Sequence, residues 1–472
     1  MLRFHPSSFA TSPATCLKTT LAPERANAFN HAMRSLTLFA LCLPVAAALA
    51  EGDPHATEVW TPVPPVVSVP ANSGIPSDAI VLFDGTSLTE WQAEAGGAPG
   101  WTVADGVLTI KPGAGGIRTK REFADCQLHL EWHSPAAVVG EGQGRGNSGV
   151  YLQGRYEVQI LDNYNNPTYA NGQAASLYKH AAPLVNACRA PGEWQTYDIV
   201  YNAPRFNGDG SVRSPARVTV LHNGVLVQDH TEFAGPTAYI GTPPYEKHPF
   251  RQALLLQEHG NPVCFRNIWI RELNTRTLFN GHDLTGWYPF LDKRARGQDP
   301  AGVFRVEDGV LHVSGSEFGY VATEESFANY YLRAEFKWGE KRYAPRDQSR
   351  RDSGILYHFA ASEPDNVWPK SFECQVQEED CGDVWCVGTQ LESPNRHLQE
   401  WGMNHIVRSE NFEHPRGEWN TIEIVCRDGE IEHWVNGHLV NSGHDASVRA
   451  GRILLQSEGA EVYYRNLVLS RY

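Results

Sequence analysis

The sequence predicts an all-β protein with two similar β-sandwich domains in tandem. The first observation is a duplication, because residues 82–91 (LFDGTSLTEW) return as residues 278–287 (LFNGHDLTGW) at an offset of 196 residues. The second is a series of short segments in which apolar and polar residues alternate with period two, as is typical of strands. The third is the lack of any convincing amphipathic helix of ordinary length in either copy. Without a helical layer, each copy must bury one sheet against another.

Further matches support a duplicated domain. Residues 105–108 (DGVL) match residues 308–311, residues 192–194 (GEW) match residues 417–419, and an Arg-Asn pair closes each copy. A period of this length is far too long for a solenoid unit. Polar residues that both copies share therefore indicate what the domain needs, and residues that differ indicate specialisation.

Individual strands and turns can be recognised in both copies. Residues 127–132 (QLHLEW) and 331–336 (YLRAEF) alternate with period two. Residues 218–227 surround an Asn-Gly pair, and residues 431–440 repeat this pattern. Asn-Gly between apolar segments is the strongest short signal for a β-hairpin.

The N-terminal residues are expected to be removed from the mature protein. Residues 33–50 have the charged start, apolar run and Ala-Leu-Ala end of a signal peptide, which predicts export to the periplasm or beyond. Residues 1–32 are then a mis-called start or an extension, and residues 51–77 form a proline-rich lead-in. The two domains are predicted to span residues 78–273 and 274–472. No later apolar run reaches membrane-spanning length.

Composition restricts the class of partner. With 40 Lys plus Arg against 54 Asp plus Glu, the formal charge is −14, which disfavours nucleic-acid binding. The basic cluster in residues 341–351 is interpreted as solvated loop charge. The 13 Trp and 18 Tyr suit a β-rich secreted protein, in which aromatic faces commonly stack against sugars.

One pair of matching strands carries the main candidate chemistry. Residues 156–162 (YEVQILD) match residues 372–378 (FECQVQE). Strand geometry separates the apolar side chains from the first Glu and the Gln, which occupy the other face. That face is either a groove with an acid and an amide on its floor or an ordinary solvated surface. The candidate catalytic acids are Glu157, Asp162, Glu373 and Glu378, with Gln159 and Gln375 as ligand-binding amides.

Other candidates flank these strands. An Asn/Asp-Ser-Gly element precedes each strand and is either a turn or a ligand contact. In the last strand of each copy, His259 and Glu458 occupy matching positions, and both can transfer protons if their pKa values are perturbed. His259 is thus a further catalytic candidate. The remaining candidate binding residues are Asn147, Tyr178, Gln257, Asp352, Asp383, Trp385, Gln456 and Glu458.

Taken together, these motifs resemble the 3-keto-disaccharide hydrolase domain family, over both copies. The resemblance rests on Leu-Phe-[Asp/Asn]-Gly with its following Trp, [Asn/Asp]-Ser-Gly, Glu-x-Gln, Gly-Glu-Trp, the Asn-Gly hairpin and the final Arg-Asn. It implies two concanavalin A-like jelly-roll β-sandwich domains. It also implies cleavage of glycosides that carry a ketone at sugar C3.

Two other classes of function stay open. Laminarinase-like glucanases carry Glu-x-Asp-x-x-Glu on a comparable strand, but an amide replaces the middle acid here. A non-catalytic carbohydrate-binding module needs only a groove with aromatic and amide side chains. An oligosaccharide or glycoside is the expected ligand in every case. No cofactor is predicted, a structural calcium ion is compatible with the fold, and the oligomeric state is left open.

Overall fold

The computed structural model describes residues 54–60, 63–71 and 73–472, so the predicted signal segment 33–50 lies outside the described residues. Among the described residues, those up to Val66 belong to a unit of their own, which contains the 3₁₀ helix η1 (Pro54–Thr57). The described remainder consists of strands and loops, with two single-turn 3₁₀ helices, η2 (Gly142–Gly144) and η3 (Ala170–Gly172). No helix in the described ranges is long and apolar enough to cross a membrane. The all-β prediction is confirmed.

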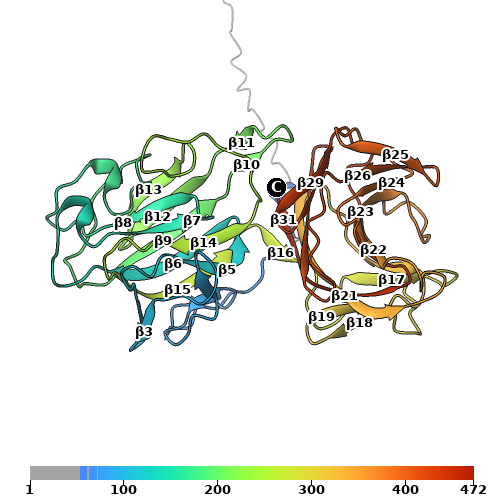
Figure 1. Cartoon of the computed structure of the whole chain (residues 1–472), viewed down its shortest axis with the longest axis horizontal. Helices are drawn as coiled ribbons and strands as arrows, with labels where there is room; N and C mark the ends of the chain where they lie inside the picture. Colours follow the sequence, from blue (N-terminus) through green and yellow to red (C-terminus); the bar gives the residue numbers. More distant parts are fainter. Residues whose placement is uncertain (1–53, 61–62, 72) are drawn as a thin grey trace, which may run out of the picture. The chain divides into compact units, whose positions relative to one another are not determined.

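In the first domain, an eight-stranded outer sheet packs on a five-stranded inner sheet, counted over the described residues (Figure 1). The outer sheet has the order β13 (Val225–Glu232), β12 (Arg217–His222), β9 (Gln195–Asn202), β6 (Cys126–His133), β15 (Cys264–Glu272), β4 (Val107–Thr109) and β3 (Thr102–Ala104), with β1 (Ile80–Phe83) paired to β15. The inner sheet has the order β2 (Trp91–Ala93), β5 (Ile117–Phe123), β14 (Gln252–Leu256), β7 (Ser148–Leu152) and β8 (Tyr156–Ile160). A separate ribbon pairs β10 (Arg205–Phe206) with β11 (Val212–Ser214).

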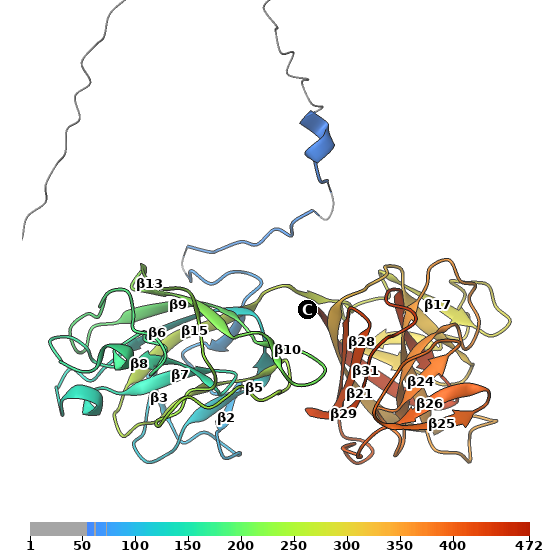
Figure 2. The same cartoon turned by 90° about the horizontal axis from the view of Figure 1, so that it is seen from above.

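The second domain repeats this plan with a wider inner sheet. Its outer sheet has the order β18 (Phe304–Glu307), β19 (Val310–Val313), β31 (Ala460–Arg471), β21 (Tyr330–Arg342), β27 (Asn420–Arg427), β28 (Glu430–Val435) and β29 (His438–Gly443), with β16 (Thr275–Thr277) paired to β31. Its inner sheet has the order β17 (Trp287–Leu291), β20 (Gly319–Thr323), β30 (Arg452–Ser457), β22 (Asp352–Phe359), β23 (Ser371–Gln377), β24 (Val384–Val387), β26 (Met403–Val407) and β25 (Arg396–Glu400). The last three strands extend this sheet beyond β23 at one edge (Figure 1), and Figure 2 shows these three, β24, β26 and β25, side by side.

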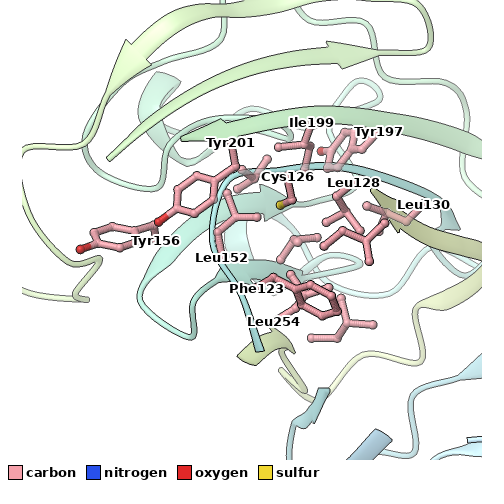
Figure 3. Close-up of a cluster of buried hydrophobic side chains, with 14 of the residues drawn as sticks. Phe123, Cys126, Leu128, Leu130, Leu152, Tyr156, Tyr197, Ile199, Tyr201 and Leu254 are labelled. Carbon is pink, nitrogen blue, oxygen red and sulfur yellow. The ribbon is translucent and has the colours of Figure 1, made fainter. Parts of the chain in front are cut away.

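The core of each domain lies between its two sheets. On β6, Cys126, Leu128, Leu130 and Trp132 are buried and alternate with half-buried polar residues, as the sequence pattern predicts. Figure 3 shows how side chains from β6 and β9 approach those of the inner sheet, including Tyr156. Burying a large apolar side chain stabilises the fold by roughly 1.5–3 kcal/mol relative to leaving it exposed.

The opening motif of each copy has a structural role. The indole Nε1 of Trp91 donates a hydrogen bond to the carbonyl oxygen of Leu82 at 2.7 Å. Trp287 donates in the same way to Leu278, also at 2.7 Å. The motif therefore ties the start of each domain, in β1 or directly after β16, to the first strand of its inner sheet.

The Gly-Glu-Trp and Arg-Asn motifs meet at the outer sheet. The guanidinium of Arg266 lies 4.1 Å from the ring centre of Trp194, and that of Arg465 lies 3.8 Å from the ring centre of Trp419. A guanidinium stacked on an aromatic ring is stabilised by attraction to the ring face. The two motifs therefore contact each other in both domains, away from the inner sheet.

Both predicted Asn-Gly hairpins are confirmed. Asn223 and Gly224 join β12 to β13 with φ values of 54° and 77°, and Asn436 and Gly437 join β28 to β29 with 49° and 81°. Asn and Gly tolerate positive φ better than other residues, so they suit this tight turn.

Candidate functional site

The first candidate site is built on β8 of the inner sheet. Tyr156, Val158 and Ile160 point into the core, which sends Glu157 and Gln159 to the opposite face. Only 2% of Glu157 and 1% of Gln159 is exposed, so this is no ordinary solvated strand face. Burial raises the pKa of Glu157 to about 7, although a hydrogen bond from Tyr151 opposes the shift. The carboxyl group can thus take up or release a proton near neutral pH.

Tyr151 is the nearest partner of this carboxyl group. Tyr151 lies on β7, directly opposite Glu157 in the strand register, and its hydroxyl donates a hydrogen bond to Glu157 Oε2 at 2.8 Å. The amide Nε2 of Gln257 donates to the Tyr151 hydroxyl oxygen at 3.3 Å. The carboxyl group, phenol and amide form one chain of hydrogen bonds.

The Ser-Gly element lies on β7, beside the carboxyl group. The largely buried face formed by Glu157, Gln159, Gly149 and Gln257 is called the floor of the first site below. Gly149 is paired with Gln159 across β7 and β8, and a Cβ atom at Gly149 would collide with Oε1 of Glu157. Its neighbour Ser148 donates a side-chain hydrogen bond to the carbonyl of Gln257 at 2.7 Å. The glycine makes room for the acid, and the serine fastens the adjacent strand.

The second domain repeats this floor. Gly354 is paired with Gln375, and a Cβ atom at Gly354 would collide with Oε1 of Glu373. Ser353 donates to the carbonyl of Gln456 at 2.7 Å. The interpretation of this element as a turn is wrong, because Ser148 begins β7 and residues 352–354 begin β22.

Matched amide oxygens on both floors lack partners. The Oε1 atoms of Gln159, Gln257, Gln375 and Gln456 are buried and accept no hydrogen bond within the described residues. The Nε2 atom of Gln456 is also buried without a partner there. A buried polar atom without a partner costs about 1–3 kcal/mol, so such atoms commonly mark places where a bound molecule completes the hydrogen bonding. Here they flank the carboxyl group of each domain and suit a hydroxyl-rich ligand.

The second domain surrounds its floor with additional charge. Asp352, Glu373 and Glu458 are 3%, 5% and 4% exposed. The guanidinium of Arg346 forms ion pairs with Asp352, at 2.5 Å, and with Glu458. Gln375 also donates to Asp352 Oδ1 at 3.0 Å. This group is called the acid cluster below.

Burial keeps protons within the acid cluster. It raises the pKa of Asp352 to about 6 and that of Glu458 to about 8, although Arg346 opposes both shifts. Burial and the charges of Glu458 and Asp352 raise the pKa of Glu373 well above its ordinary value. The cluster therefore contains proton donors as well as acceptors near neutral pH.

The predicted residues at the corresponding positions of the first domain are arranged differently. Asn147 replaces Asp352, and its amide donates to the Gln143 carbonyl at 2.7 Å. His259 replaces Glu458 but is exposed, and it forms no hydrogen bond or ion pair within the described part of the chain. The structure thus brings Glu458 to the floor of its domain but does not bring His259 to Glu157 by any such contact.

The third acid of each predicted strand is held by an arginine. Asp162 follows β8 and pairs with Arg145 at 2.7 Å, whereas Glu378 follows β23 and pairs with Arg351 at 2.8 Å. Both acids lie beyond the strands that carry Glu157 and Glu373. Their ion pairs fasten the loops that precede β7 and β22.

Three other predicted residues lie next to the strands that carry Glu157 and Glu373. Asp383 is buried and accepts hydrogen bonds from His405 at 2.7 Å and from Arg408, so its oxygens are already occupied. Trp385 lies opposite Glu373 in the strand register and stacks on His405 with 4.1 Å between ring centres. In the first domain, the Tyr178 hydroxyl shares a 2.7 Å hydrogen bond with Tyr169.

Sequence reasoning missed Tyr151 and Arg346. The interpretation of residues 341–351 as solvated loop charge is wrong for Arg346 and Arg351, which pair with buried or half-buried acids. Their spacing gave no signal, because each partner lies on another strand or loop. Among the described residues, no group of three or more His, Cys, Asp or Glu side chains has the geometry of a metal site. A structural calcium ion stays a prediction that no observation tests.

The family is now identifiable. A model of the 3-keto-alpha-glucoside-1,2-lyase-like domain matches residues 78–271 and again residues 274–470. The chain belongs to this family. Membership confirms two tandem concanavalin A-like jelly-roll domains and places the chain among glycoside-acting enzymes or carbohydrate-binding proteins.

Several solved structures are similar to part of the chain. A Parabacteroides distasonis protein provisionally named a glycosyl hydrolase is 52% identical, with 47% of this chain and 97% of that chain covered and a TM-score of 0.45. A second such protein from this organism is 23% identical, with 42% and 94% covered and a TM-score of 0.31. A Bacillus licheniformis β-glucanase is 11% identical, with 42% and 96% covered and a TM-score of 0.29. No match was found among curated proteins.

Proposed function

We propose that the protein cleaves 3-keto-disaccharides or related 3-keto-glycosides by elimination followed by hydration. The observation that carries this proposal is the floor found in both domains, where a buried Glu lies over a Gly between two amides with unpartnered oxygens. A sugar offers the hydroxyl donors that these oxygens lack. The carboxyl group is then placed to exchange a proton with the bound ring.

The chemistry follows from the ketone. A ketone at C3 acidifies the C2 proton, so Glu157 or Glu373 removes it as a base and an enolate forms. The electron pair then forms the C1=C2 double bond while the C1–O bond breaks, and the leaving oxygen receives a proton. Water adds across the double bond, which returns a proton to C2 and gives net hydrolysis.

The second domain is better equipped for the steps that stabilise the enolate and protonate the leaving oxygen. The unpartnered Nε2 of Gln456 is a buried donor that suits the enolate oxygen. The acid cluster supplies a proton for the leaving oxygen, with Glu458 as the leading donor because its pKa is raised to about 8. In the first domain, the Nε2 of Gln257 is engaged by Tyr151 and the position of Glu458 is taken by the exposed His259. We therefore assign the faster reaction to the second domain.

The conventional glycosidase is less well supported. That mechanism needs two carboxyl groups on either side of the scissile bond. The third acid of the strand, Asp162 or Glu378, is instead paired with an arginine. In the second domain, Asp352 and Glu458 share the guanidinium of Arg346. Sugar binding without turnover is the alternative for the first domain, which has one acid where the second has three.

The test uses matched glucosides with and without a 3-keto group, incubated in heavy water and followed by mass spectrometry and NMR. We expect release only from the keto substrate, with deuterium at C2 of the released keto sugar. Cleavage of the unoxidised glucoside without C2 exchange would establish the conventional mechanism instead. Binding without cleavage of either glucoside would establish a carbohydrate-binding protein.

A further inference from the structure

The inner sheet of the first domain carries a hollow on the same face as Glu157. Its volume is about 500 Å³. It is lined by charged, amide and apolar side chains, including Glu94, Arg118, Glu122, Arg155, Gln252 and Leu255. None of these residues belongs to the site described above.

The strand register connects this hollow to the carboxyl group. Leu255 on β14 is paired with Arg118 on one side and with Tyr151 on the other, and Tyr151 is paired with Glu157. These four residues form one row across the sheet. Glu157 lies two strands from Leu255, which is about 10 Å at the usual spacing between strands.

The second domain closes the same region with aromatic side chains. The opening motif aligns Glu94 with Phe290, and the strand pairing aligns Arg118 with Ala322. Phe290 packs there against a buried cluster that includes Tyr320 and Leu454. The hydroxyl of Tyr320 donates to Asp365 at 2.6 Å, which fastens a loop over the cluster. The hollow is therefore a property of the first domain and not of the shared fold.

The chemistry of the hollow suits additional sugar rings. Arg118 and Glu94 are exposed at the hollow, and their side chains form no hydrogen bond or ion pair within the described residues, so both are available to a ligand. A guanidinium donates to hydroxyl oxygens, and a carboxylate accepts from hydroxyl groups. Leu255 and Ala253 supply an apolar surface between them for the C–H face of a ring.

We infer that this hollow binds the sugar residues of a longer saccharide beyond the ring held at Glu157, so that the first domain selects oligosaccharides and the second selects short glycosides. The inference rests on the proposed function in assigning a sugar to the Glu157 floor. It assigns the hollow a separate role in recognition, with no part in bond cleavage.

Binding of unoxidised sugars tests the inference independently of the keto chemistry. Glucose oligomers of one to four residues, in α-1,4 and β-1,4 series, are titrated against the full protein by calorimetry and NMR. We expect at least one series to bind about tenfold more tightly at four residues than at one. Arg118→Ala should remove most of this gain, as should Leu255→Glu, which replaces the apolar surface with a charge. Arg121→Ala, on the same strand but paired with Glu90 and not lining the hollow, is the control and should keep the gain.

Each result decides the inference. Affinity that does not rise with chain length in either series overturns it, as does a gain that survives both variants in a folded protein. Cleavage of 3-keto-disaccharides alongside such a result would leave the proposed function intact. Length-dependent binding lost in both variants, in a protein that cleaves no keto-glycoside, would support the hollow and refute the proposed reaction.

Discussion

The two domains place the same carboxyl group over the same glycine, yet they surround it with different charges. In the first domain, Glu157 has a phenol as its nearest partner, and the neighbouring position holds the amide of Asn147. In the second, Glu373 lies within a cluster of three buried acids and one arginine. The comparison separates what the floor requires from what each domain adds.

The same contrast extends along the sheet. The first domain leaves a hollow where the second is filled by aromatic side chains, and the second extends its sheet beyond β23 by three strands. The duplicated floor thus has different surroundings in the two domains. Divergence of this kind is expected when one copy specialises in chemistry and the other in recognition.

The largest effect is expected when the acid that both domains share is removed. Glu373→Gln keeps the size of the side chain but removes proton transfer, so kcat on a 3-keto-disaccharide should fall by about 10² or more while KM changes less. The residual activity should belong to the first domain and rise with pH through about 7, where Glu157 ionises. Adding Glu157→Gln should remove it.

The control for this prediction is Glu379→Gln, at an exposed acid six residues from Glu373. Steady-state kinetics from pH 5 to 9 provide the measurement. Full activity in the double variant would refute the assignment of both bases.

A smaller effect is expected from the glycine that both floors share. Gly354→Ala places a methyl group against the Glu373 carboxyl group and must displace it. Because a small misplacement of a reacting group slows the chemical step, kcat should fall about tenfold. Gly144→Ala is the matched control, because a Cβ atom there meets open space. Unchanged kinetics in a Gly354→Ala protein with an unaltered melting temperature would show that the close approach has no catalytic role.

The smallest effect concerns stability and tests the charge difference. The folded-state pKa of Asp352 is raised to about 6, above the value of about 3.9 in an unfolded chain. The folded form therefore holds the proton more tightly, and this contribution to stability is full below about pH 4 and lost as the pH rises through about 6. The unmodified protein should therefore lose unfolding free energy as the pH rises from about 4 to about 8. Asp352→Asn, which places the residue type of Asn147 at this position, should make that loss smaller by about 1–3 kcal/mol.

The reciprocal variant sharpens this prediction. Asn147→Asp introduces an acid into the first domain without an equivalent of Arg346, so it should add a pH-dependent loss of stability there. Urea unfolding at several pH values measures both, with the exposed Asp229→Asn as control. Identical pH profiles for Asp352→Asn and the unmodified protein would contradict the raised pKa of Asp352.

The sequence by itself determined the features that depend on local spacing. Period-two alternation assigned Tyr156 to the core and Glu157 to the opposite face, and Asn-Gly pairs located both hairpins. The duplication selected Glu157 and Glu373 from all the acids in the chain. These features were predictable because strand geometry and turn chemistry act over a few residues.

Only the tertiary structure decided the environment of these acids. Arg346 reaches Asp352 and Glu458 from a loop, and Tyr151 reaches Glu157 from the neighbouring strand. The matching positions of His259 and Glu458 gave no indication that one would be exposed and the other buried. Burial and charge pairing depend on segments far apart in sequence, whereas alternation records only the face on which a side chain lies.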